Sequence, residues 1–295
     1  MAHKPDVYAT AGIYDATLPP YRFGKDLQQL IADEELLRQK VESVYGDPSQ
    51  QLNVLEVGAG TGRMSQILLP YAHQLTVTDK FPGMLDVLRQ KIPNANVVQT
   101  NTRDIADEIH PARQFDFVGA YWTLSYPIGE YLETIEDDKI IPIPDLAKGV
   151  ALAKRMIDSL VEYVRPQDGM FHAYFFDSES PEQKVVTKIW EQLAPDPGGR
   201  RSFTREILAS ALGESAEARG YDFYETHHSG IAPFSSREEM ISWFGICHAK
   251  GKRILTDTRL FMHETAELAE AHANSDGTVD LPVGMYEYTI KTKAK

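Results

Sequence analysis

Three glycines and two carboxylates lie at a spacing suited to binding a ligand that contains ribose. Gly58, Gly60 and Gly62 occupy every second position just after a short apolar run that carries Glu56 near its end. Glycine adopts positive φ at little cost and lets the backbone come close to a ligand. Asp79 ends the next apolar run, and a carboxylate there can accept hydrogen bonds from both ribose hydroxyls.

The spacing of the glycines separates two classes of cofactor. The dinucleotide fingerprint Gly-x-Gly-x-x-Gly needs a glycine where this chain has Arg63, which argues against an NAD-dependent enzyme. Counted from Glu56, the pattern is Glu-x-Gly-x-Gly-x-Gly. This pattern resembles motif I of the class I S-adenosylmethionine-dependent methyltransferases.

The resemblance implies S-adenosylmethionine as the cofactor. In that family the loop backbone contacts the methionine part, and the acidic residue of the first strand reaches its amino group through water. The acidic residue after the second strand binds the ribose. We assign the adenine amino group to Asp104, with the cap of a short helix as the alternative. The residues that the resemblance places at the cofactor are Glu56, Gly58, Ala59, Gly60, Gly62, Asp79, Met84, Asp104, Ile105 and Tyr121.

Aromatic side chains follow the fourth expected strand, where ligands lie in this type of sheet. Tyr121, Trp122 and Tyr126 can stabilise a sulfonium cation or stack on a planar substrate, although buried core positions would explain them equally well. The segment has no Asn/Asp-Pro-Pro-Tyr/Phe and no Pro-Cys, and the chain has no clear Asp-Asp-Asn metal trio. These absences argue against the substrates that those motifs serve. The aromatic side chains favour a planar metabolite of phenolic or indolic type.

Two adjacent histidines are candidates for proton transfer. His228 precedes Ser229-Gly230, a predicted turn that would expose it, and an exposed imidazole can deprotonate a hydroxyl or an amine. A surface pair without a catalytic role is the alternative. The candidates for catalysis are His228, Tyr121 and Trp122. The candidates for substrate binding are Tyr14, Tyr21, Trp122, Tyr126 and His227.

Composition restricts the partners and the environment. The formal net charge of -13 disfavours phosphate backbones, so we expect no nucleic acid substrate. The single cysteine, Cys247, excludes an internal disulfide, and no His-Glu-x-x-His motif is present, so no metal is expected. No apolar run is long enough for a membrane helix, and the polar N-terminus lacks a signal-peptide core. We therefore expect a cytoplasmic protein; the sequence leaves its oligomeric state open.

Alternation of strand and helix patterns predicts an α/β fold, a Rossmann-like, mostly parallel sheet of about seven strands with helices on both faces. Residues 1–48 are expected to form an N-terminal lid or substrate arch, in which the apolar spacing from Asp26 to Val44 predicts a helix. Residues 49–295 are expected to form the core, with a C-terminal helical insertion at about 235–275. Within the core, the acidic, proline-broken segment Glu130–Pro144 is expected to be a loop. The expected strands are Leu52–Val57, Gln74–Asp79, Asn96–Thr100, Phe115–Tyr121, Met170–Phe176, Asp222–His227 and Thr278–Thr292.

These observations predict a methyltransferase that acts on a small, aromatic metabolite by in-line transfer to oxygen, nitrogen or carbon. The alternative is a regulatory protein that binds S-adenosylmethionine or S-adenosylhomocysteine without methyl transfer. The sequence does not identify the substrate.

Overall fold

A nine-stranded sheet forms the centre of the molecule, in the order β2-β1-β10-β11-β9-β6-β3-β4-β5. The computed structural model describes residues 15, 21–24, 27, 29–48, 51–110, 112–136, 139–193 and 201–293. The strands of this sheet are β1 (Arg22–Gly24), β2 (Ile31–Ala32), β3 (Leu52–Val57), β4 (Ala72–Asp79), β5 (Asn96–Gln99), β6 (Phe117–Tyr121), β9 (Met170–Phe176), β10 (Asp222–Phe234) and β11 (Val279–Lys291).

The seven expected strands are confirmed. β5, β4, β3, β6 and β9 pair in parallel with their neighbours, while β11 lies antiparallel between β9 and β10. The expected number of strands was too low, because β1 and β2 extend the sheet beyond β10. Within the proposed lid region, therefore, Arg22–Gly24 is part of the sheet.

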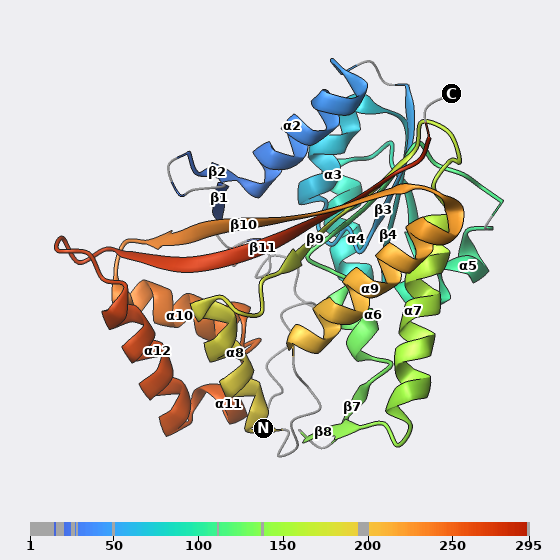
Figure 1. The fold of residues 1–295 in the computed structure, drawn as a ribbon. Coiled ribbons are helices and arrows are strands. Elements are labelled where there is room, and N and C mark those ends of the chain that lie inside the picture. Colours follow the sequence, from blue (N-terminus) through green and yellow to red (C-terminus); the bar gives the residue numbers. More distant parts are fainter. Residues whose placement is uncertain are drawn as a thin grey trace.

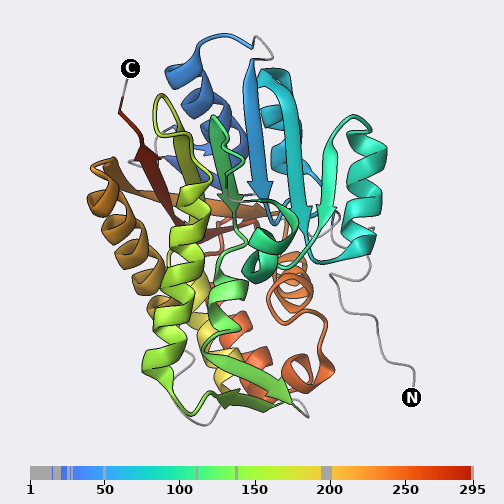
Figure 2. The same ribbon diagram turned by 90° about the vertical axis from the view of Figure 1, so that its right-hand side faces the viewer.

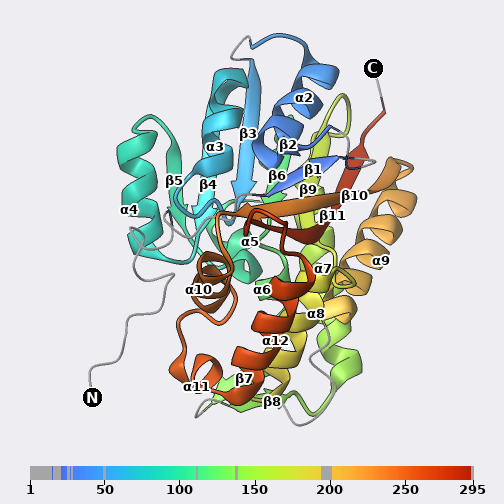
Figure 3. The same ribbon diagram turned by 90° about the vertical axis from the view of Figure 1, so that its left-hand side faces the viewer.

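Helices cover both faces of the sheet, and each face has its own hydrophobic cluster (Figures 2 and 3). One face carries α2 (Asp33–Tyr45), α3 (Arg63–Leu68), α4 (Pro82–Lys91) and α8 (Pro181–Glu191). The other carries α5 (Ile105–Glu108), α6 (Ser125–Gly129), α7 (Leu146–Glu162) and α9 (Arg201–Arg219). Short 3-10 turns occupy Leu69–Tyr71 and Thr102–Asp104. The two-faced arrangement confirms the expected layers.

Local sequence explains where several helices begin. Ser180 caps α8 by accepting a hydrogen bond from the Gln183 N–H, and Pro181 occupies the first turn, where its missing N–H costs nothing. Asp145 accepts a hydrogen bond from the Lys148 N–H in the same way at the start of α7. These caps fix the point at which each chain segment leaves the sheet.

A long hairpin of β10 and β11 carries the C-terminal helices. All thirteen residues of β10 pair in register with β11, from Asp222 opposite Lys291 to Phe234 opposite Val279. Between the two strands lie α10 (Arg237–Cys247), α11 (Arg253–Thr256) and α12 (Arg259–Ala271). Figure 1 shows these helices gathered with α8 below the far end of the hairpin. The expected helices of this region are therefore present.

Three local expectations were wrong. The segment expected as a loop at 130–144 contains a small antiparallel hairpin of β7 (Glu133–Glu136) and β8 (Lys139–Pro142). The helix expected from Asp26 begins at Asp33. Ser229 and Gly230 do not form a turn; they continue β10 and pair with β1. In the described part of the chain, no helix is long and apolar enough to cross a membrane.

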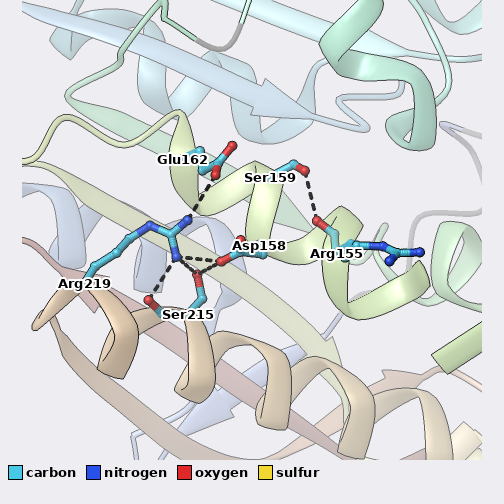
Figure 4. Close-up of polar contacts among 6 residues, drawn as sticks. All are labelled: Arg155, Asp158, Ser159, Glu162, Ser215 and Arg219. Atoms are coloured by element: carbon cyan, nitrogen blue, oxygen red, sulfur yellow. Dashed lines mark hydrogen bonds and ion pairs between the residues drawn. The ribbon is translucent and has the colours of Figure 1, made fainter. Parts of the chain in front are cut away.

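An exposed polar cluster joins α7 to α9 on one face of the sheet (Figure 4). The Arg219 guanidinium donates to Asp158 Oδ1 at 2.6 Å and to Glu162 Oε1 at 3.3 Å. The Ser215 hydroxyl donates to the same Asp158 oxygen at 2.6 Å. The side chains of Asp158 and Glu162 are 42% and 50% exposed. The cluster therefore links the two helices while its carboxylates remain in contact with water.

Candidate functional site

The glycine loop lies between the end of β3 and the start of α3. Gly58, Gly60 and Gly62 have φ of +67°, +55° and +87°, in the left-handed region that glycine tolerates best. A Cβ on Gly58 would lie 2.0 Å from Thr123 Oγ1. Any larger residue at position 58 would therefore clash with the Thr123 side chain, which follows β6. Ala59 is buried and its N–H donates to the Thr78 carbonyl at 2.9 Å. The loop is thus fixed in a shape that presents backbone to the carboxyl edge of the sheet.

Asp79 ends β4 beside this loop. The Gly60 N–H donates to Asp79 Oδ2 at 2.9 Å, and the Phe81 N–H donates to Oδ1 at 2.9 Å. Burial raises the pKa of Asp79 above its ordinary value, while these two donors act in the opposite direction. A carboxylate has about four lone-pair positions, so acceptor capacity remains for two ribose hydroxyls.

Glu56 lies beneath the loop. Its side chain is 2% exposed, and the Ser65 hydroxyl donates to Oε2 at 2.5 Å. Burial raises the pKa of Glu56 to about 8, so the carboxyl group is largely protonated at neutral pH. A cationic amino group next to it would lower this pKa again. The role expected for Glu56 at the cofactor remains a prediction.

The loops after β4, β5 and β6 meet at Glu130, which sequence reasoning missed. Glu130 Oε1 accepts from Lys80 Nζ at 2.7 Å, and Oε2 accepts from Asn101 Nδ2 at 3.1 Å and from Arg103 Nε at 3.3 Å. Burial would raise the pKa of Glu130, but these donors hold it below its ordinary value. No local sequence pattern marks Glu130, because its partners come from distant segments.

The remaining cofactor candidates lie on these neighbouring elements. Met84 is buried in the first turn of α4, and Ile105 is buried at the start of α5. Asp104 is exposed and makes no capping bond; the cap of its turn is Asn101, which accepts from the Arg103 N–H. Asp104 does occupy the N-cap position of the short helix α5, as the alternative interpretation expects, but without a side-chain capping bond. Its contact with adenine stays a prediction.

The tip of β6 holds Trp122 in an unusual conformation. Its φ is +60°, in a region that bulky residues rarely adopt. The indole Nε1 donates to Asp33 Oδ2 at 2.8 Å, and the ring stacks on Phe23 at 5.9 Å and contacts Phe176 at 5.1 Å. Such strain persists only where the surroundings hold it.

Tyr121 and His228 belong to one buried polar chain under α2. The Tyr121 hydroxyl lies 3.4 Å from His172 Nδ1, and His172 Nε2 lies 3.1 Å from Glu287 Oε1. Glu287 also accepts from His228 Nε2 at 2.8 Å and pairs with Lys40 Nζ at 2.5 Å. All these groups except the lysine are less than a tenth exposed.

This environment determines protonation. Burial lowers the pKa of His172, so its imidazole is neutral at pH 7. Burial would raise the pKa of Glu287, but hydrogen bonds from His172, His228 and Lys40 hold it well below its ordinary value. His228 is 5% exposed rather than presented on a turn, and its Nδ1 has no partner among the described residues. Because His228 Nε2 is bound to Glu287, Nδ1 is the nitrogen of His228 that could accept a substrate proton.

The substrate candidates are divided among three places. His227 is exposed and lies 2.8 Å from Asp177 Oδ2, just after β9. Tyr126 stacks under Lys250, whose Nζ is 4.7 Å from the ring centre. The buried Tyr21 donates its hydroxyl to Glu182 at 2.5 Å. Tyr14 lies outside the described residues.

Tyr21 also connects the chain's N-terminal part to the C-terminal helices. Glu182 Oε1 accepts from His248 Nε2 at 2.8 Å as well as from Tyr21. Burial would raise the pKa of Glu182, but the His248 imidazole and the other donors hold it below its ordinary value. Across the part of the chain that the structure describes, no group of three or more His, Cys, Asp or Glu side chains could hold a metal ion.

Comparison with known proteins finds similarity in one segment of the chain. Residues 54–135 match the family model described as a methyltransferase domain. An uncharacterized methyltransferase-like protein of Schizosaccharomyces pombe is 33% identical over 84 residues, which is 28% of this chain and 28% of that protein. The chain thus aligns with little more than a quarter of this relative.

Solved structures match the fold over most of the chain. The YcgJ protein from Bacillus subtilis has a TM-score of 0.51 at 15% identity, covering 88% of this chain and 99% of that one. The [4+2]-cyclase SpnF has a TM-score of 0.52 at 13% identity, covering 98% and 95%. The family match thus finds a methyltransferase domain at residues 54–135, and these solved structures share the Rossmann-like fold of the chain.

Proposed function

We propose that this protein transfers the methyl group of S-adenosylmethionine to a small, aromatic metabolite. The cofactor supplies an electrophilic methyl group on a positively charged sulfur atom. The protein mainly aligns the two reactants and excludes water, because the leaving thioether is neutral. We retain the prediction that no nucleic acid is a substrate and that the protein is cytoplasmic.

The observation that carries this proposal is the pairing of the glycine loop with Asp79. Three left-handed glycines face the carboxyl edge, and the Gly60 N–H donates to the Asp79 carboxylate. We infer that the loop holds the methionine part and that Asp79 holds the ribose. The family match over residues 54–135 supports this assignment.

The aromatic groups at the β6 tip support the choice of substrate. Trp122, Tyr21 and Phe23 lie within ring distances of 5.6 to 5.9 Å, and Trp122 is only partly buried. Such a surface favours a planar substrate and a cationic sulfur. Tyr126 and His227 are proposed to line the same region. We retain the proposal that residues 1–48 form a lid or substrate arch over this region.

We assign removal of a substrate proton to His228. The neighbouring His227 serves as the matched control residue. His228 would act through Nδ1, since Nε2 is bound to Glu287. If it is the base, His228→Ala should lower the turnover rate by roughly 10²–10⁴ with cofactor affinity intact. A loss below about threefold, or a larger loss in His227→Ala, would exclude this role.

Calorimetry tests the cofactor assignment. S-adenosylhomocysteine should bind in the micromolar range and NAD should not bind. Asp79→Ala should weaken binding by at least about tenfold, because charge-assisted hydrogen bonds to the ribose are lost. Asp86→Ala is the control, since Asp86 lies exposed on α4 and pairs with Arg89. Equal affinity in both variants would contradict the ribose assignment.

Methyl transfer needs its own measurement, because one fold supports several reactions; the similar structure of a cyclase is an example. Protein incubated with methyl-labelled cofactor and a metabolite extract should transfer label to a small molecule. Binding of S-adenosylhomocysteine without any consumption of label would favour the alternative, a regulatory protein.

A further inference from the structure

A buried carboxylate joins the glycine loop to the tip of β6. Asp33 is the first residue of α2 and is 2% exposed. Its Oδ1 accepts from Arg63 Nη1 at 2.7 Å, and its Oδ2 accepts from Arg63 Nη2 at 2.8 Å and from Trp122 Nε1 at 2.8 Å. One side chain therefore fixes α2, α3 and the strand tip relative to one another.

Arg63 joins Asp33 to the glycine loop. It directly follows Gly62 and begins α3. A guanidinium group is planar and its two-bond contact with a carboxylate has a defined orientation, so a change of the backbone at Arg63 is transmitted to Asp33. Glu34 Oε1 lies 3.2 Å from Arg63 Nη1. In a variant that neutralises Asp33, Glu34 would therefore still provide a counter-charge for the Arg63 guanidinium.

Trp122 joins Asp33 to the proposed substrate region. Its backbone lies in the left-handed region, and its N–H donates to the Tyr174 carbonyl at 3.1 Å. The hydrogen bond from Asp33 is made to the indole Nε1 of Trp122, so it acts on the ring itself. A strained residue at the end of a central strand has its orientation determined by such contacts.

We propose that Asp33 and Arg63 are positioning residues that couple occupation of the glycine loop to the orientation of the Trp122 indole. The proposal rests on the proposed function only in requiring that S-adenosylhomocysteine binds the loop. Coupling of this kind is reciprocal, so an indole held by a substrate would also strengthen cofactor binding. Neither side chain needs to contact the reacting atoms.

Fluorine NMR can follow the indole directly. The chain has three tryptophans, so protein labelled with 5-fluorotryptophan gives a simple spectrum, and Trp122→Phe identifies the Trp122 signal. S-adenosylhomocysteine is added until calorimetry shows saturation. We expect the Trp122 signal of the unmodified protein to shift on saturation, which needs neither turnover nor a known substrate.

Two variants test the coupling. Asp33→Asn removes the charge that orients the guanidinium, and Arg63→Lys keeps the charge but loses the two-bond contact. In each, the shift at saturation should fall to less than about half of the unmodified value. If one variant does not fold, the other still answers the question.

Asp116→Asn is the matched control. Asp116 is also buried, at 5% exposed, and pairs with Arg165 at 2.5 Å while accepting from the Asn53 N–H at 2.7 Å. It lies at the opposite, amino end of β3. This variant should lose stability but keep the full Trp122 shift.

The possible outcomes separate the two proposals. A full Trp122 shift in Asp33→Asn or Arg63→Lys at saturation would overturn the coupling and leave the proposed function intact. An equal loss of the shift in Asp116→Asn would also overturn it, because the effect would then reflect general destabilisation. Failure of S-adenosylhomocysteine to bind the unmodified protein would overturn the proposed function, and the coupling with it.

Discussion

Each face of the sheet carries a cluster of ion pairs, and the two clusters lie in different surroundings. On the α7–α9 face, Arg219 and Asp158 form an ion pair in which the carboxylate is 42% exposed. On the α2 face, the Glu287 side chain is 11% exposed and binds Lys40 and two imidazoles. Water replaces a lost partner on the first face but not on the second. Similar distances therefore predict very different energies.

The two clusters also differ in their distance from the candidate site. The Arg219 cluster connects two helices along their exposed sides (Figure 4). The Glu287 cluster connects α2 to three strands and reaches Tyr121 at the end of β6 through His172. A change in the first cluster should affect stability alone, whereas a change in the second should also disturb the strand tips.

Removal of the Glu287 carboxylate should have the largest effect. Glu287→Ala leaves the Lys40 ammonium and two imidazoles without their acceptor in a buried site. We expect the free energy of unfolding to fall by about 3–5 kcal/mol, measured by denaturant titration. Glu287→Gln, which keeps an acceptor, should lose less. A loss in Glu287→Ala as small as that of an exposed pair would show that water enters this cluster.

Acidification should affect the α2 face first. The pKa of His172 is lowered from 6.5 in the folded protein, so the unfolded chain takes up the proton first and folding weakens as the pH falls below that value. The contribution is at most about 1.4 kcal/mol per pH unit for one proton. The pKa of Asp158 is lowered from 3.8, so its contribution is lost only at lower pH.

The measurement compares His172→Gln with the unmodified protein. Denaturant titrations between about pH 7.5 and about pH 5 should show a shallower loss of stability in the variant. Asp158→Asn should leave the slope in this range unchanged. Parallel pH profiles for His172→Gln and the unmodified protein would mean that His172 titrates normally.

The exposed pair should give the smallest effect. Arg219→Met removes the hydrogen bonds to Asp158 and Glu162 but leaves both carboxylates in contact with water. We expect a loss of about 0.2–1 kcal/mol, reduced further at high salt. A loss above about 2 kcal/mol would place this pair in the same class as the buried cluster.

Sequence reasoning found the parts of the fold that local periodicity determines. Leu52–Val57 and Met170–Phe176 were predicted with their observed bounds, because buried parallel strands give continuous apolar runs. β1 and β2 were missed, since strands of two or three residues carry no periodic signal. α9 follows a segment rich in proline and glycine, and its pattern was not recognised.

The interpretation of Gly230 shows a specific limit. Next to Ser229, it indicates a turn by composition. In the structure a Cβ there would lie 2.4 Å from the Arg22 carbonyl oxygen and 2.5 Å from the Phe23 ring. This glycine therefore permits a close approach between β10 and β1. Only the position of the distant β1 could have distinguished the two interpretations.

The candidate site divides in the same way. The loop glycines and Asp79 were found because their spacing along the chain determines their geometry. Asp33, Glu130 and Glu287 were missed, because each acts through partners from distant segments. The burial of His228 under α2 likewise depends on tertiary contacts that no neighbouring residue indicates.

The long hairpin has a consequence for how the chain can tolerate insertions between its two strands. Phe234 and Val279 lie opposite each other at its end, so residues 235–278 leave and rejoin the sheet at adjacent points. A segment with neighbouring ends can be exchanged for one of another length without altering the strand register. We therefore predict that residues 235–278 tolerate changes of length at their exposed turns while the pairing of β10 with β11 stays the same.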